Sequence, residues 1–200
     1  MRRAFLLGGG AAFVTFILPR ASRAAAPGRP ASDAAPRRLA LRHAATGATF
    51  EGPWHDGVAP DPAAMRDLSA ALADPGCTPP LPFDPDTIAL VWEIASRARL
   101  GELDIRSGYR TPQVNRRVHG AGDSLHVRAS AVDLGVPRNR LGMVAEMATR
   151  LGAGGVGVYA RSSFLHLDTG PVRRWGDGGE ARRQEEALAR IAEAWGRGGR

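Results

Sequence analysis

The sequence predicts an α+β domain in which a small antiparallel sheet is flanked by helices. Two observations predict it. Three segments begin with Asp or Thr followed at once by proline, the signal of a capped helix start, and two of them continue with apolar residues at helical spacing. Short runs of alternating polarity lie before and after these segments and are joined by tight turns, as in antiparallel strand pairs.

The amino terminus is predicted to be a targeting segment that precedes this domain. Arg2 and Arg3 stand before an uncharged apolar run, and Ser22-Arg23-Ala24 places small residues at the positions that a signal peptidase reads. We interpret residues 1–24 as a signal peptide, of the twin-arginine type because of the paired arginines. This predicts a periplasmic or exported protein that meets a membrane only transiently. The alternatives are an ordinary secretory signal and a retained anchor, although a bilayer-spanning helix needs about 20 apolar residues.

The charge balance does not indicate a nucleic-acid partner. The chain has 27 Lys and Arg against 20 Asp and Glu, and the predicted signal peptide holds four of the arginines and no acid. The mature chain keeps a surplus of three positive charges, which is ordinary for a soluble domain. The single cysteine, Cys77, excludes an internal disulfide and a cysteine-rich metal cluster. Any zinc must therefore be held by His and carboxylate side chains.

A linker and a β-hairpin are predicted to follow the signal peptide. Residues 25–37 are rich in Ala, Pro and Arg and show no apolar periodicity, which is typical of a linker. The folded domain is predicted over residues 38–178. It opens with two strands, Leu39–His43 and Ala48–Trp54, which flank the turn residues Thr46-Gly47.

Helices dominate the next part of the chain. Two amphipathic helices are predicted at about residues 62–73 and 85–99, each introduced by Asp-Pro. The proline-rich stretch between them is predicted to be a loop. A brief strand over Leu103–Arg106 then precedes a short polar helix that starts at Thr111-Pro112 and ends near residue 119.

The last part of the domain is predicted to be a helix followed by a strand pair. The helix runs from about Arg138 to Leu151 and stops at a cluster of glycines. Val156–Tyr159 and Phe164–Asp168 have the pattern of two paired strands. Residues 179–200 are polar and are predicted to form a charged carboxy-terminal helix and tail.

Candidate chemistry lies around two of the five histidines. His126 and Asp133 are seven residues apart, and an odd separation puts them on opposite faces of a straight strand, so they converge only if the chain bends at Arg128-Ala129-Ser130. His166 and Asp168 share one face of a strand. Two imidazoles and one carboxylate leave tetrahedral zinc a fourth position for water, as in hydrolytic sites, although buried histidines often only satisfy hydrogen bonds.

The other three histidines have simpler interpretations. His43 and His55 lie in the predicted hairpin, where an exposed structural role is the default. His119 ends a short helix, where it can interact with the terminal carbonyls. Because His119 and Asp123 are near the candidate site in sequence, an accessory part in substrate binding stays open for both.

Several motifs together resemble one known family. They are Ser107-Gly108-Tyr109-Arg110-Thr111-Pro112 with Asn115, Ser124-Leu125-His126 with Asp133, Gly154–Gly157, Phe164–Asp168 and Arg173–Trp175. Over about residues 38–175 this combination resembles the YcbK-like murein endopeptidases. That family belongs with the D-alanyl-D-alanine metallopeptidases, in the clan of the hedgehog signalling domain and the lysostaphin-type peptidases. The resemblance implies a hedgehog-type fold, a Zn2+ cofactor and peptidoglycan peptides as substrate.

The resemblance also implies roles for individual residues. The zinc ligands fall on His126, Asp133 and His166, and an active-site arginine falls on Arg110. A guanidinium there can stabilise negative charge on a carbonyl oxygen or hold a substrate carboxylate. The simpler alternative is a surface arginine that caps a turn.

One position departs from the pattern of related carboxypeptidases. They carry a Glu three residues before the last His ligand as general base, and Ser163 occupies that position here. Serine is a poor base at neutral pH. Asp168 is our candidate for the base, and the competing role for it is to accept the second N–H of His166 and fix the orientation of the ring.

These inferences together predict an exported zinc metallopeptidase that cleaves amide bonds in peptidoglycan stem peptides or cross-links. The serine at position 163 motivates an alternative, a zinc-containing cell-wall-binding module with weak or no turnover. A Ser–His–Asp hydrolase built from Ser124 or Ser130 with His126 and Asp133 is a third arrangement, but no Gly-x-Ser-x-Gly elbow supports it. The sequence predicts neither the oligomeric state nor whether the bond cut is internal or carboxy-terminal.

Overall fold

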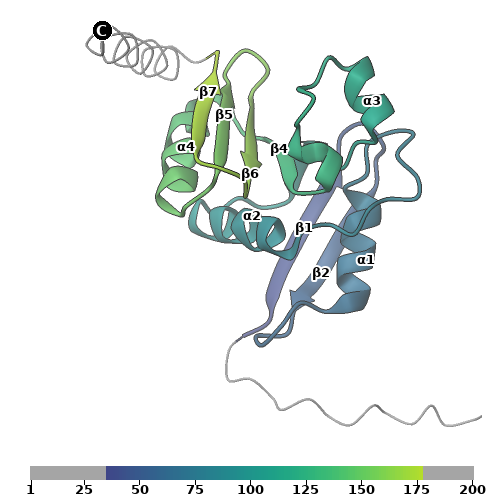
Figure 1. Cartoon of the computed structure of the whole chain (residues 1–200). Coiled ribbons are helices and arrows are strands. Elements are labelled where there is room, and N and C mark those ends of the chain that lie inside the picture. The colour runs from purple at the N-terminus through teal and green to yellow at the C-terminus, as the bar shows by residue number, and fades with distance from the viewer. Residues whose placement is uncertain (1–34, 178–200) are drawn as a thin grey trace, which may run out of the picture. The chain divides into compact units, whose positions relative to one another are not determined.

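A computed structural model of the chain describes residues 35–177, which form one sheet with helices packed around it (Figure 1). The predicted signal peptide and the predicted carboxy-terminal helix lie outside the described residues, as does almost all of the predicted linker. None of the helices in the described range has the length and apolar character that crossing a membrane requires.

The sheet has seven strands in the order β2-β1-β3-β4-β6-β5-β7. The strands are β1 Arg37–His43, β2 Thr49–His55, β3 Leu103–Ser107, β4 Ala131–Gly135, β5 Gly155–Tyr159, β6 Phe164–Asp168 and β7 Arg173–Gly176. The α+β class is confirmed, but the sheet is larger than predicted and is mixed, since β1 pairs with β3 and β5 with β7 in parallel. Strand β7 was not predicted because a short polar segment carries no alternation of polarity.

The helices begin where the capping signals predict. They are α1 Pro62–Ala71, α2 Pro85–Arg97, α3 Pro112–Arg117 and α4 Leu141–Arg150, with 3-10 turns η1 Leu125–Arg128 and η2 Arg138–Arg140. The side chains of Asp61, Asp84 and Thr111 each accept a backbone N–H of the following turn, and proline occupies the first turn of each helix. Helix α4 begins three residues later than predicted, because η2 takes up its first turn.

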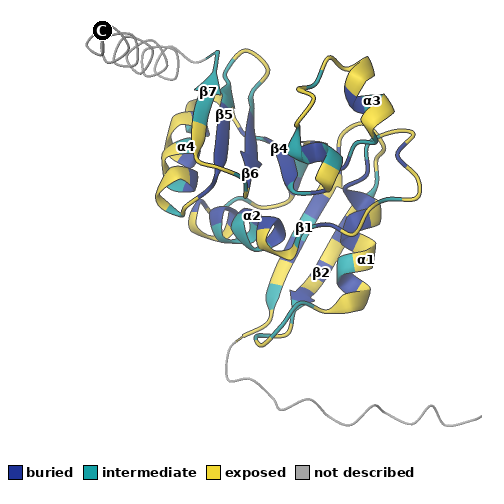
Figure 2. Cartoon of the chain, viewed as in Figure 1, coloured by how far each residue is buried: buried dark blue, intermediate teal, exposed yellow. Residues whose placement is uncertain are grey.

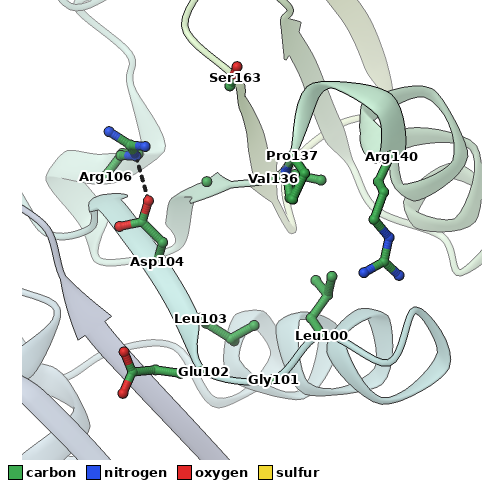
Figure 3. A pocket seen from close by; sticks show the side chains of 11 residues that line it. Leu100, Gly101, Glu102, Leu103, Asp104, Arg106, Val136, Pro137, Arg140 and Ser163 are labelled. Carbon is green, nitrogen blue, oxygen red and sulfur yellow. Dashed lines mark ion pairs between the residues drawn. The ribbon is translucent and has the colours of Figure 1, made fainter.

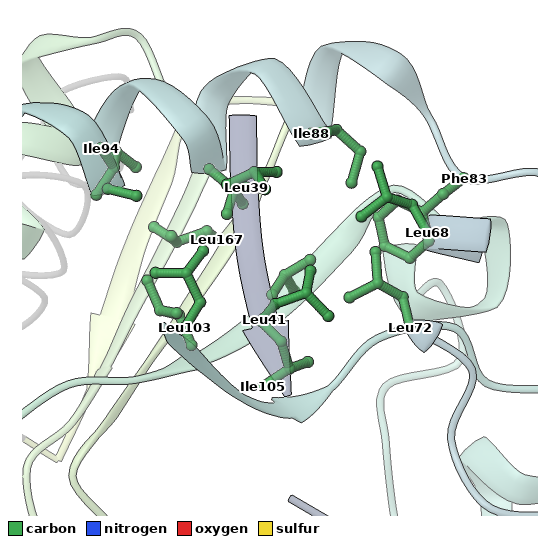
Figure 4. Packing of buried hydrophobic residues seen from close by; sticks show 14 of the residues in the cluster. Leu39, Leu41, Leu68, Leu72, Phe83, Ile88, Ile94, Leu103, Ile105 and Leu167 are labelled. Atoms are coloured by element: carbon green, nitrogen blue, oxygen red, sulfur yellow. The ribbon is translucent and has the colours of Figure 1, made fainter. Parts of the chain in front are cut away.

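The hydrophobic core lies between the helices and one face of the sheet. Strand β1 alternates buried Leu39 and Leu41 with outward-facing neighbours, and Ile88 and Ile94 of α2 point toward it (Figure 4). Each such fully buried aliphatic side chain stabilises the fold by about 1.5–3 kcal/mol relative to an exposed one. The outer faces of α1, α2 and α4 are exposed (Figure 2).

The central strands are buried on both faces, and only one of these faces packs against the apolar core. Strands β4 and β6 have buried residues at nearly every position, including Asp133 and His166. Leu134 and Leu165 belong to the apolar core. The carboxylate and the imidazole therefore lie on the face of the sheet that the core does not use.

Candidate metal centre

One row of residues crosses the sheet at the candidate site. From β3 to β7 the register places Ser107, Asp133, His166, Gly157 and Trp175 side by side. Paired residues of neighbouring strands project to the same face. The row therefore brings the second and third predicted ligands together, next to an aromatic side chain.

A β-bulge adds Ser107 to this row. Ile105 pairs with Leu134 and Ser107 pairs with Asp133, so Arg106 is the extra residue on β3. Without the bulge, Ser107 would face the core as Ile105 does, because residues two apart share a face. The extra residue re-aims the serine hydroxyl toward the polar face.

His126 reaches the row from outside the sheet. It lies on the 3-10 turn η1, and the chain then passes through Ala129 in the left-handed conformation, with φ at 53°, before β4 begins. This is the bend that the spacing of His126 and Asp133 requires, and it falls in the predicted segment. The His–Asp–His cluster, His126, Asp133 and His166, is buried and brings its ligand atoms within 4.8 Å of one another.

The distances within the cluster suit a tetrahedral metal ion. Asp133 Oδ1 lies 3.2 Å from His126 Nε2 and 2.9 Å from His166 Nδ1. The two ring nitrogens are 3.2 Å apart. Ligands bound to zinc at about 2.0–2.1 Å in a tetrahedron are about 3.3 Å from one another. The cluster therefore needs only a slight expansion to hold the ion.

Hydrogen bonds outside the cluster fix which ring nitrogens face inward as acceptors. His126 Nδ1 donates to the carbonyl of Gly108 at 2.6 Å, so the lone pair of Nε2 faces the cluster. His166 Nε2 donates to Asp168 Oδ2 at 2.9 Å, which leaves the lone pair of Nδ1 facing inward. When both rings are neutral, three acceptors thus converge with no hydrogen atom between them. Three lone pairs that converge on one point are suited to bind a cation.

The pKa values of Asp133 and His166 are shifted by burial and by the contacts of these side chains with their neighbours. Burial alone would raise the pKa of Asp133, but hydrogen bonds with His126 and His166 and the charges on these rings hold it well below its usual range. Burial alone would lower the pKa of His166, whereas its hydrogen bonds with Asp133 and Asp168, and their charges, raise it. A proton therefore occupies the centre readily, and a metal ion must compete with it.

Asp168 lies behind the ring of His166, on the side away from the cluster. Its fully buried carboxylate also accepts the N–H groups of Gly155 and Gly170, both at 2.8 Å, and Arg173 Nη2 at 2.7 Å. Burial raises the pKa of Asp168, but these hydrogen bonds and the one from His166 lower it to about 2. The carboxylate lies behind His166 and is not among the residues that line the cavity above the centre, which favours the orienting role over that of a general base.

Arg110 contacts the cluster through Asp133. Its Nη2 donates to Asp133 Oδ2 at 3.0 Å, and its Nε donates to Ser107 Oγ at 2.8 Å and Asp74 Oδ2 at 3.1 Å. The side chain is 13% exposed and lines the cavity above the centre. The alternative of a surface arginine is therefore wrong.

Sequence reasoning missed Asp74 and misjudged His43. His43 is fully buried, not exposed, and its Nε2 lies 3.0 Å from Asp74 Oδ1. Asp74 follows α1 in a loop whose sequence carries no recognisable motif. Because its partners lie 31 to 36 residues away, no local signal identifies it.

A cavity of about 590 Å³ opens above the centre. Besides the cluster and Arg110, it is lined by the two accessory candidates and by an aromatic wall: His119, Asp123, Tyr159, Phe164 and Trp175. The ring of Trp175 lies 5.1 Å from that of His166, and its Nε1 donates to the Tyr159 hydroxyl at 2.8 Å. The cavity is large enough for a peptide side chain and its flanking amides, and it presents both apolar and charged surface.

Ser163 lies away from the centre. It adopts a left-handed conformation, with φ at 54°, in the turn between β5 and β6, and it lines a separate cavity of about 440 Å³ together with Asp104 and Arg106 (Figure 3). The cavity beside the His–Asp–His cluster does not include it.

Comparisons with known proteins found relatives that match most of this chain. A family model described as peptidoglycan L,D-endopeptidase MepK matches residues 31–175. The probable peptidoglycan L,D-endopeptidase MepK of Haemophilus influenzae is 31% identical over an alignment of 181 residues that covers 87% of this chain and 95% of that protein. The peptidoglycan L,D-endopeptidase MepK of Escherichia coli K12 is 29% identical over 182 residues, covering 87% of this chain and 96% of that protein.

Proposed function

Because the chain belongs to the peptidoglycan L,D-endopeptidase MepK family, we propose that it is a zinc-dependent murein endopeptidase that cleaves the L,D-type amide bond named for its relatives. The observation that carries this proposal is the convergence of three acceptor atoms, from His126, Asp133 and His166, beside a cavity of about 590 Å³. Their distances and chemistry fit a tetrahedral ion with one free position.

When bound there, zinc supplies Lewis-acid polarisation of the scissile carbonyl and activation of water. The protein supplies orientation. Gly108 and Asp168 hold the two imidazoles from behind, while Arg110 holds the second oxygen of Asp133. A guanidinium at this place also stabilises negative charge that develops on the carbonyl oxygen of the substrate.

The proton acceptor belongs on the cavity side of the centre. His119 and Asp123 are titratable residues that line this cavity, and we assign proton transfer to one of them. We expect the variant of the true base, His119→Gln or Asp123→Asn, to lose about 100-fold or more in kcat while it keeps its metal. The other variant should remain within a few-fold of the parent. If neither variant changes kcat, the assignment is wrong.

The alternative of an inactive binding module has no remaining support in the site. It was motivated by Ser163, and that residue lines the other cavity. The proposal of an active enzyme therefore stands on the cluster and on the aromatic and cationic groups around it.

We also propose that residues 1–24 export the protein to the periplasm by the twin-arginine route, on the basis of Arg2 and Arg3. Fusion of these residues to a reporter that fluoresces only when it is folded before export would test this. Replacement of both arginines by lysine should retain the reporter in the cytoplasm. Export that persists in this variant would indicate an ordinary secretory signal.

The direct test of the function is digestion of purified sacculi with zinc-loaded residues 25–200, followed by separation of the muropeptides. We expect release of products cut at an L,D bond, and no release by His126→Ala or Asp133→Ala. Metal analysis of the same three proteins should give one zinc per chain for the parent and a clear loss for the variants. A parent that binds no stoichiometric metal would refute the proposal.

A further inference from the structure

Asp74 lies at the centre of a buried network that reaches the candidate metal centre through Arg110, and also through Gly108, whose carbonyl accepts His126 Nδ1. Its Oδ1 accepts His43 Nε2 at 3.0 Å and the N–H of Gly108 at 2.9 Å. Its Oδ2 accepts Ser107 Oγ at 2.6 Å and Arg110 Nε at 3.1 Å. The Asp74 side chain is only 11% exposed. Each carboxylate oxygen therefore receives two donors, which only an ionised carboxylate can satisfy.

The buried His43 acts in this network as a donor. The backbone N–H of Ala45 donates to His43 Nδ1 at 3.2 Å, so Nδ1 carries a lone pair and Nε2 carries the proton. The ring is fully buried and cannot turn toward solvent. His43 therefore holds Asp74 Oδ1 in place, which leaves Oδ2 facing Ser107 and Arg110.

Backbone hydrogen bonds beside Asp74 also hold the segment from Ser107 to Arg110. The N–H of Asp74 donates to the carbonyl of Tyr109 at 2.9 Å, and the N–H of Tyr109 donates to Leu72 at 2.8 Å. Gly108 lies so close that any Cβ on it would meet the Leu72 carbonyl. The segment from Ser107 to Arg110 is thus fastened to the end of α1 by both main chain and side chain.

The consequence falls on Arg110. Its Nε is fixed by Asp74 and Ser107, and its Nη2 is fixed by Asp133. A planar guanidinium held at two of its three nitrogens has no freedom to rotate. The remaining nitrogen, Nη1, makes no hydrogen bond to any residue in the described part of the chain, and Arg110 lines the cavity.

We propose that Asp74, held in place by neutral His43, is a positioning residue that fixes the orientation in which the Arg110 guanidinium faces the substrate. Its role in turnover rests on the proposed function, whereas its hold on Arg110 does not. Asp74 contacts none of the three predicted metal ligands directly, and it lies one residue from Asp133 through Arg110 and one residue from His126 through Gly108. An effect that passes through Gly108 would not depend on the residue at position 110, whereas the proposed effect does.

The substitution Asp74→Asn tests this hold selectively. The Asn amide keeps one oxygen, which can accept from only one of the two pairs of donors around Asp74. Its NH2 group then faces the other pair, which are donors as well. The orientation with the lower cost keeps the oxygen on His43 and Gly108, since the Ser107 hydroxyl can rotate, and it turns an NH2 group toward Arg110 Nε. The matched control is Asp104→Asn, because Asp104 forms an exposed ion pair with Arg106 on β3 and lies outside the metal centre.

We expect Asp74→Asn to lower kcat for sacculus digestion by about 10–100-fold with zinc stoichiometry unchanged. In the Arg110→Lys background the same change should cost less than about twofold, because the fork that Asp74 holds is already absent. Equal losses in both backgrounds would mean a merely structural role and would overturn the proposal. Asp104→Asn should change nothing in either background.

A second readout does not need activity. In a crystal structure of Asp74→Asn, the Nη2 contact of Arg110 with Asp133 Oδ2, at 3.0 Å in the parent, should be lost or the guanidinium should occupy more than one orientation. A single unchanged orientation would overturn the proposal. If the parent cuts no sacculi while the variant releases Arg110, the proposed function fails and the positioning role survives. If Asp74→Asn does not fold, Asp74→Ser removes the carboxylate with a smaller side chain, and the same outcomes apply to it.

Discussion

At the scale of single residues, Asp133 shows how the centre is held together. Its Oδ1 faces the two imidazoles, and its Oδ2 accepts Arg110 at 3.0 Å. Each imidazole in turn donates to an oxygen behind it, from Gly108 or Asp168. These outer partners decide which atoms face the proposed metal position, so we expect their loss to be visible in metal binding as well as in turnover.

We predict that Asp168→Asn weakens zinc binding by about 10–100-fold. The amide has only one oxygen for the His166 N–H, the two backbone N–H groups and Arg173 that now share the carboxylate. The measurement is competition with a zinc chelator at pH 7, with Asp104→Asn as the control. A variant that binds zinc as tightly as the parent would contradict the orienting role.

The ionisation of Asp74 should appear in the pH dependence of stability. Burial raises the pKa of Asp74, but hydrogen bonds from His43, Ser107 and Gly108 and the charge of Arg110 lower it overall from 3.8. A carboxyl whose pKa is lower in the folded state stabilises the fold above its unfolded pKa, and this contribution is lost as the pH falls toward the folded pKa. The difference in unfolding free energy between the metal-free parent and Asp74→Asn should therefore be largest at neutral pH and shrink below about pH 4.

Urea unfolding of both proteins at several pH values between 7 and 3 measures this difference. If the difference in unfolding free energy stays constant, or grows in acid, the network does not stabilise the ionised carboxylate.

At the scale of elements, the row of residues across five strands brings together side chains that no single strand could place side by side. Gly157 lies between His166 and Trp175 in this row, and it has no side chain. A Cβ at this position would lie 2.7–2.9 Å from three atoms of the indole. The glycine therefore leaves the space in which Trp175 lies against the ring of a predicted metal ligand.

We predict that Gly157→Ala displaces Trp175, destabilises the fold by about 1–3 kcal/mol and lowers activity. Gly142→Ala is the control, since Gly142 is exposed in α4 and nothing lies within 4 Å of its Cβ position. Alanine there should stabilise the helix by about 0.5–1 kcal/mol. Thermal unfolding and tryptophan fluorescence report the two effects. An unshifted fluorescence spectrum in Gly157→Ala would contradict the packing argument.

At the scale of the whole described domain, the centre ties together parts of the chain that are distant in sequence. Its predicted ligands come from η1, β4 and β6, and the groups that hold the two imidazoles from behind come from the residue after β3 and from the end of β6. Asp168 and Arg110 are in turn held by residues at the start of β5 and after α1. A metal ion bound only by the folded state stabilises all of these elements at once.

We therefore predict that removal of zinc by a chelator lowers the melting temperature reversibly. At a free zinc concentration of about 100 Kd the ion contributes about 2.7 kcal/mol. A domain of this size shifts by about 2–4 °C for each kcal/mol. The control is His126→Ala, whose melting temperature should not respond to the chelator. An equal response in both proteins would place the effect elsewhere.

The sequence alone determined the parts of this protein that depend on neighbours in the chain. Capping residues and prolines set the starts of α1, α2 and α3 within a few residues. The period of β6 placed His166 and Asp168 on one face, and the motifs selected His126 and Asp133 as their partners. Helical and strand periodicities act over only a few residues, so the chain itself carries these signals.

Only the tertiary structure decided the contacts between distant segments. It put Asp168 behind the ring of His166, turned Ser163 toward the other cavity, and buried His43 against Asp74. It also introduced the bulge at Arg106 that brings Ser107 to Asp133. These contacts join residues far apart in the chain, or depend on the side from which a group approaches. They arise from the path of the chain through the sheet, and no local periodicity encodes that path.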